Sequence, residues 1–116
     1  MTGRHALVHR VVAEVPALEP LLSEHLDDMD GELLPHLLFY DFTRWAQAQP
    51  RDSEDLSRFL AVLEDAYAGQ DMDQREVIYV SFLENLDPSS PVFDLLGQRL
   101  AGDARDFRAR PPESGQ

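Results

Sequence analysis

Apolar residues recur every three to four positions along most of the chain, and polar residues fill the opposite face. This spacing is typical of amphipathic α-helices. It predicts about six helices, at residues 3–15, 18–29, 34–49, 54–68, 71–87 and 91–101. The cleanest apolar stripe belongs to the fourth helix and consists of Leu56, Phe59, Leu60, Leu63, Ala66 and Tyr67.

The fifth segment, residues 71–87, differs from the others because residues 77–86 leave no polar face wide enough for a surface helix. Its β-branched and aromatic residues would also suit a buried strand. We favour a helix because Asp71 and Gln74 form a capping-box pattern, and no second strand-like run exists to pair with it. We therefore predict an all-α fold, a compact single-domain bundle in which the other helices surround a central buried helix at residues 71–87.

Glycine and proline mark several helix ends. Gly31 is expected to take the left-handed conformation that ends the second helix, and Pro35 occupies the first position of the third. Gly97, within the last predicted helix, should permit close approach of a neighbouring helix. Residues 108–116 are basic and then proline-rich, so we expect the helical domain to cover residues 1–107 and residues 108–116 to form a flexible tail.

Length and composition set the broad class. The 116 residues, 43% of them hydrophobic, can build one core but not two comfortable ones. The absence of cysteine excludes a disulfide scaffold, a thiolate zinc site and a cysteine nucleophile. No apolar run has the length of a membrane span, and the N-terminal segment lacks the apolar core of a signal peptide. We expect a soluble, cytoplasmic protein with no membrane partner.

The charge is strongly negative. The chain has 22 Asp and Glu residues against 10 Arg and no Lys, which gives a formal net charge of −12. Such a surface repels nucleic acid phosphates, so nucleic acid is a poor partner. A basic protein, by contrast, would be attracted and its encounter accelerated. The alternative is that the acidic residues only keep a small protein soluble.

The densest group of acids follows the second predicted helix and comprises Asp27, Asp28, Asp30 and Glu32. It does not match a calcium-binding loop, because two ligand positions would fall on Leu26 and Leu37. We take this group as the first candidate for contact with a cationic partner. The second candidate group is Glu64, Asp65, Asp71 and Asp73.

Aromatic side chains could supply apolar anchors beside the acidic residues. Phe39 and Tyr40 project away from the main apolar stripe of the third helix. They could anchor a partner, or they could equally pack against the N-terminal helix.

One acid lies on an apolar face. Asp41 falls among the residues of the third helix that we expect to face inward, which are Leu34, Leu37, Leu38, Phe42 and Trp45. A buried carboxylate needs hydrogen-bond partners, and a helix N-terminus, Arg44 or a residue of the central helix could provide them. We favour a structural role for Asp41 over a role as a functional acid.

Catalytic and metal-binding patterns are weak. His5 and His9 have the spacing of two metal ligands on one helix face, but no further ligands are marked nearby. Ser81, His36 and Asp41 can be combined on paper into a hydrolase trio, yet no nucleophile elbow surrounds the serine. We therefore predict no enzymatic activity, no cofactor and no metal.

Three spaced motifs carry a resemblance: GELLPH at residues 31–36, Asp41 followed by Arg44 and Trp45, and VSFLENL at residues 80–86. Together they resemble a family of small bacterial all-helical domains of unknown function. The resemblance implies a compact helical fold and a gene of the kind often found near polymorphic toxins, where small acidic proteins serve as immunity proteins. It implies no catalytic residues.

The residues shared with this family include Asp41, Trp45, Ser81 and Asn85. Ser81 and Asn85 lie one turn apart on a helix and could meet Asp41. With Arg44, these residues are expected to form a structural polar cluster inside the core.

Two hypotheses of function follow. In the first, the protein is an immunity protein that binds and neutralises a co-encoded bacterial toxin, a basic protein domain, through its acidic surface. In the second, it is a non-catalytic structural or adaptor module, which could form a homodimer through spare apolar surface on the first or last helix.

Overall fold

The structure of the protein, a computed structural model, describes residues 3–87 and 89–109, with side chains described as far as residue 105. Over these residues the fold is all-α and compact, with seven α-helices, two short 3₁₀ turns and no strand. The prediction of an all-α single domain is confirmed.

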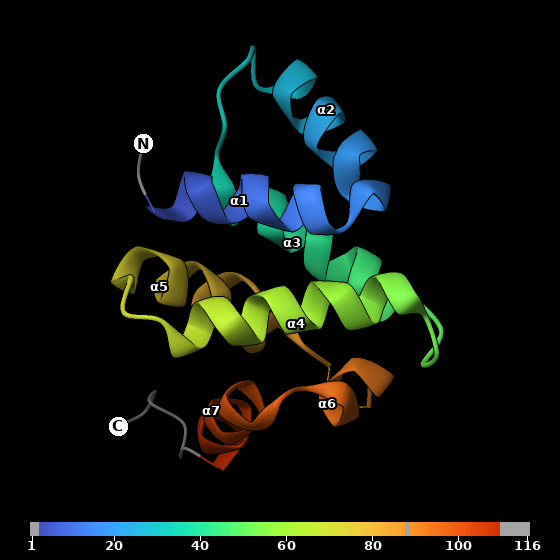
Figure 1. The fold of residues 1–116 in the computed structure, drawn as a ribbon, viewed down its shortest axis with the longest axis vertical. Helices are drawn as coiled ribbons and strands as arrows, with labels where there is room; N and C mark the ends of the chain where they lie inside the picture. Colours follow the sequence, from blue (N-terminus) through green and yellow to red (C-terminus); the bar gives the residue numbers. More distant parts are fainter. Residues whose placement is uncertain (1–2, 88, 110–116) are drawn as a thin grey trace, which may run out of the picture.

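The elements follow one another through short connections. The first half contains α1 (Gly3–Glu14), η1 (Pro16–Leu18), α2 (Glu19–Asp28) and α3 (Pro35–Gln47). The second half contains α4 (Glu54–Ala68), α5 (Met72–Ser81), η2 (Leu83–Asn85), α6 (Pro91–Leu95) and α7 (Gln98–Ala109). Figure 1 shows α2 at one end of the molecule, α6 and α7 at the other, and the remaining helices between them.

The centre of the fold is α5 with the turn that follows it. α5 contacts α1, α3 and α4. Val77, Ile78 and Ser81 are buried on the helix, and Phe82, Leu83 and Leu86 are buried beyond it. The predicted burial of this segment is confirmed.

The predicted length of the central helix is wrong, because α5 ends at Ser81 and residues 83–85 form a 3₁₀ turn. In a longer helix, the carbonyl oxygens of Val80 and Ser81 would accept hydrogen bonds from backbone amides, but here both contact side chains. Asn85 Nδ2 donates to the Val80 carbonyl at 3.0 Å, and Thr43 Oγ1 lies 3.0 Å from the Ser81 carbonyl. The backbone amide of Asn85 donates to the carbonyl of Phe82 at 3.1 Å, and this spacing of three residues is that of a 3₁₀ turn.

The last predicted helix, residues 91–101, is in fact two helices. The backbone is extended at Leu96 (φ −64°, ψ 143°), and α7 then runs to Ala109. The carboxylate of Glu64 on α4 accepts the amides of Arg99 at 2.9 Å and Leu100 at 3.2 Å, so it caps α7. A Cβ at Gly97 would lie 2.5 Å from Glu64 Oε1, which agrees with the close approach expected there. Of the predicted tail, residues 110–116 lie outside the described residues.

Other helix ends follow the sequence closely. α4 has the predicted bounds, and Ser53 caps it by accepting the Leu56 amide at 3.1 Å. Asp71 caps α5 by accepting the amides of Asp73 and Gln74. The capping box is wrong in its second half, because Gln74 Nε2 donates instead to the carbonyl of Gly3 at 3.0 Å and so ties α5 to α1.

Aromatic rings join the helices at the core. Phe59 of α4 makes edge-to-face contacts with Phe42 of α3 (centroids 6.1 Å apart), with Trp45 of α3 (5.6 Å) and with Phe82 (5.7 Å). Phe42, Phe59 and Phe82 are fully buried. Such pairs add to the free energy gained by burying the rings themselves.

We predict that Phe59→Ala lowers the free energy of unfolding by about 3–5 kcal/mol, because it removes a ring shared by three contacts and leaves a cavity. Urea denaturation followed by circular dichroism measures this change. Leu37→Ala is the control, since Leu37 is 45% exposed, and it should cost under about 1 kcal/mol. Equal losses in the two variants would contradict the assignment of Phe59 to the centre of the core.

Candidate functional site

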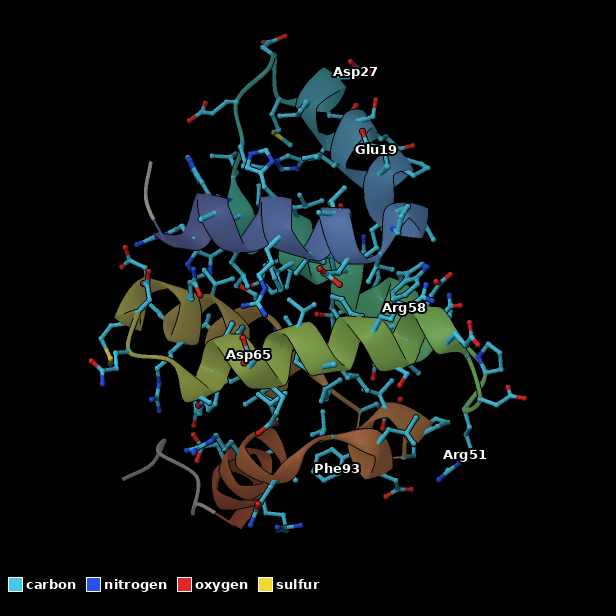
Figure 2. The ribbon with its side chains drawn as sticks, in the orientation of Figure 1. Glu19, Asp27, Arg51, Arg58, Asp65 and Phe93 are labelled. Carbon is cyan, nitrogen blue, oxygen red and sulfur yellow. The ribbon has the colours of Figure 1, made fainter. Side chains whose placement is uncertain are left out.

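The first group of predicted partner-binding acids is fully accessible. Asp27, Asp28, Asp30 and Glu32, hereafter the acidic lobe, are all exposed. None of them forms an ion pair with another described residue, since every described salt bridge lies elsewhere. Figure 2 shows Asp27 and Glu19 on α2, at the opposite end of the molecule from Phe93 of α6.

The sequence around the lobe explains why its charge is not balanced. Residues 11–43 contain no Arg or Lys, and their acids are Glu14, Glu19, Glu24, Asp27, Asp28, Asp30, Glu32 and Asp41. Asp27 and Asp28 lie in the last turn of α2, where the negative end of the helix dipole disfavours a carboxylate by about 0.3–1 kcal/mol. The lobe therefore combines mutual repulsion with an unfavourable helix end.

The backbone turns sharply within the lobe. Asp30 (φ 55°) and Gly31 (φ 86°) both take positive φ, so the left-handed conformation predicted at Gly31 is confirmed and is shared with Asp30. The Gly31 amide donates to the Leu26 carbonyl at 2.7 Å, and the Glu32 amide donates to the Met29 carbonyl at 3.0 Å. These bonds satisfy carbonyls at the end of α2 and hold Asp30 and Glu32 beside the helix.

A buried histidine fixes the far side of this turn. His25, on the inner face of α2, is only 5% exposed, and its Nε2 accepts the backbone amide of Leu34 at 3.0 Å. In this hydrogen bond Nε2 is the acceptor, so it is the ring nitrogen that carries no proton. Sequence reasoning missed this residue. Its position three residues after the buried Leu22, on the apolar face of the helix, was the available signal.

The second group of predicted acids is already engaged within the fold. Glu64 caps α7 and Asp71 caps α5. Asp65 pairs with Arg10 of α1 at 2.7 Å, and Asp73 lies 3.4 Å from Arg4. A partner that bound these carboxylates would have to replace contacts between helices.

The expected polar cluster in the core does not form. Asp41 is partly exposed and pairs with Arg44 on its own helix, so one of its three suggested partners is confirmed. Asn85 is exposed and bonds to the Val80 carbonyl. Because α5 ends at Ser81, Asn85 is not one helical turn beyond it on the same face. Trp45 is half-buried against Phe59.

Ser81 has a different partner from the one expected. Its hydroxyl lies 2.8 Å from His36 Nδ1 on α3. Ser81 is fully buried and Asp41 is occupied with Arg44. His36 and Ser81, two members of the hydrolase trio considered above, are therefore adjacent, but the buried Ser81 hydroxyl is not accessible to a substrate. Their contact joins α3 to α5.

The aromatic anchors also need correction. Phe39 is fully buried, with its ring centroid 5.2 Å from that of Phe42, so it is not available to a partner. Tyr40 is partly exposed and stays a candidate. Leu37, predicted to face inward, is 45% exposed. The buried face of α3 is rotated towards Phe39, Thr43 and Ala46. α3 contacts α5, and Thr43 on this face lies 3.0 Å from the Ser81 carbonyl.

Among the described residues, no group of three or more His, Cys, Asp or Glu side chains has an arrangement that could hold a metal ion. No helix in that part of the chain is both long enough and apolar enough to cross a membrane.

These features define a small all-α domain with one unbalanced acidic end. The chain belongs to the family described as a domain of unknown function (DUF7674), whose profile matches residues 8–105. The matched segment begins within α1 and ends within α7, so it includes part of these two helices and all of the helices between them. Comparisons with curated proteins and with solved structures found no match.

We predict that His25→Ala loosens the lobe. The Leu34 amide loses its acceptor, which should lower the free energy of unfolding by about 1–3 kcal/mol. Amide hydrogen exchange at Leu34 should also become faster than in the parent protein. His9→Ala is the matched control, because His9 is exposed on α1. Unchanged protection of the Leu34 amide in His25→Ala would show that the bond does not hold this turn.

Proposed function

We propose that the protein is an immunity protein whose acidic lobe binds the basic surface of a co-encoded toxin domain. The observation that carries the proposal is the state of the four lobe carboxylates, which are exposed and lack ion pairs with the described residues. The resemblance of the spaced motifs to small domains encoded near toxins supplies the class of partner.

The structure favours the lobe over the second acidic group as the binding surface. A cation that approached Asp65 would compete with Arg10 at 2.7 Å, and one that approached Glu64 would compete with the amides at the start of α7. A cation that approaches Asp27 or Asp28 displaces only water. The net gain from a charged contact is therefore larger at the lobe than at the second acidic group.

Binding at the lobe would also relieve strain that the free protein carries. Repulsion among neighbouring carboxylates, and the helix dipole at the end of α2, both raise the free energy of the unbound state. An arginine or lysine from a partner lowers both contributions. His25 and the hydrogen bonds of Gly31 and Glu32 hold the turn in place beforehand, so little conformational entropy is lost on binding.

The mode of inhibition follows from the same charges. A toxin that cleaves nucleic acid binds phosphates through arginine and lysine side chains. The acidic lobe would occupy those side chains, and Tyr40 on α3 could add a less polar contact. Neutralisation then results from competition for the cationic surface of the toxin.

The test uses the purified protein and the product of the adjacent gene. Neutralising the lobe with Asp27→Asn, Asp28→Asn, Asp30→Asn and Glu32→Gln should weaken binding about 10-fold or more, mainly through loss of charge. Asparagine tolerates the positive φ of residue 30, so the fold should be kept. Affinity should also fall as salt is raised, because salt screens exposed charges.

The matched control removes the same charge from another surface. Asp52→Asn, Glu54→Gln, Glu84→Gln and Asp94→Asn alter four exposed acids away from α2 and should leave affinity within about 2-fold. Cells that express the toxin should be protected by the control variant and not by the lobe variant. The proposal would be overturned if the lobe and control variants lost the same affinity for the toxin, or if the parent protein neither bound the toxin nor protected the cells. In that case, a stable homodimer in solution would favour the adaptor hypothesis.

A further inference from the structure

A polar cavity of about 420 Å³ lies between α4, α5 and α7. It is lined by Tyr67 of α4, Arg75 of α5 and four residues of α7, which are Gln98, Arg99, Gly102 and Asp103. Figure 1 shows α7 at the opposite end of the molecule from α2, so this cavity is separate from the acidic lobe. Its volume falls within the range of small-molecule sites.

Two of the described arginines that lack an ion pair line this cavity, and a third, Arg105 of α7, is exposed and is not among the lining residues. Five described arginines lie within 4.0 Å of a carboxylate, namely Arg4, Arg10, Arg44, Arg51 and Arg58. Arg75 and Arg99 form no ion pair with the described residues, although acids outnumber basic residues 22 to 10 in the chain. Two unneutralised guanidinium groups thus share one cavity in a protein of net charge −12.

Arg75 is held in place without using its hydrogen-bond donors. Its guanidinium carbon lies 4.8 Å from the centroid of the Tyr67 ring, a cation–π contact. Tyr67 is itself 5% exposed, and its hydroxyl donates to Asp103 Oδ2 at 2.5 Å. Burial and this hydrogen bond raise the pKa of the Tyr67 hydroxyl, so it stays protonated as a donor. The planar N–H groups of Arg75 remain free for a bidentate contact with an oxyanion.

Asp103 does not cancel this positive charge. One of its oxygens accepts the Tyr67 hydroxyl, and it is the one acid among the lining residues, which include two arginines. The nearby carboxylate of Glu64 is engaged by the backbone amides of Arg99 and Leu100. The lining residues therefore carry a net positive charge, in a protein whose formal net charge is −12.

We propose that the cavity between α4, α5 and α7 binds a small oxyanion, either a phosphate group or a carboxylate, through Arg75 and Arg99. The two guanidinium groups would clamp the anion, while Gln98 offers an amide to a neighbouring polar group. The proposal is independent of the function assigned to the acidic lobe.

The test titrates the protein with inorganic phosphate, and separately with citrate, while following backbone amide NMR signals at constant ionic strength set with chloride. Signals of residues 67, 75 and 98–103 should shift in a saturable manner. The variant Arg75→Gln with Arg99→Gln should weaken binding 10-fold or more. The control Arg58→Gln with Arg105→Gln removes the same charge outside the cavity and should change affinity less than 2-fold.

A second variant tests the cavity without altering its charge. A Cβ at Gly102 would have nothing within 4 Å, so Gly102→Leu should fill the space and keep the fold while it abolishes binding. Saturation by phosphate alone or citrate alone assigns the class of oxyanion, and saturation by both supports the shared site. Absence of saturable shifts with both anions, or equal affinity in the Arg75/Arg99 and control variants, would overturn the proposal.

Discussion

Enclosure of α5 and of the turn after it is the constraint on which the rest of the structure depends. α5 buries Val77, Ile78 and Ser81 among α1, α3 and α4, and Phe82 then packs against Phe59. A helix covered on several sides needs neighbours on each of those sides, and α1, α3 and α4 supply them. The hydrophobic effect drives this burial, and ring contacts and side-chain hydrogen bonds fix its geometry.

The same constraint divides the acidic residues into two populations. Acids near the central helices serve the fold, because Asp71 caps α5, Glu64 caps α7 and Asp65 pairs with Arg10. α2 lies at one end and contacts chiefly η1 and α3, so its outer acids have no basic neighbour in the described fold. The proposed binding surface is thus the densest group of acids that the fold leaves without ion pairs among the described residues.

Local signals in the sequence predicted the local features of the fold. The bounds of α4 follow from its apolar stripe and Ser53, and the cap of α5 follows from Asp71. The errors arose where distant residues decide. Where α5 ends, its Ser81 carbonyl meets Thr43, 38 residues away along the chain, and where α7 begins, its amides meet Glu64 of α4. For the candidate site, the exposed acids could be found from the sequence, but the engagement of the second group and the clamp by His25 required the tertiary contacts.

Site-resolved amide hydrogen exchange tests the enclosure of α5 most directly. The account predicts that the amides of Val77, Ile78 and Ser81 exchange more slowly than those of α2, because they open only with global unfolding. It also predicts that the amides of the acidic lobe exchange faster than those of α5, except for the hydrogen-bonded amides of Gly31 and Glu32. Exchange of the α5 amides at the rate of α2 would contradict a fold built around an enclosed central helix.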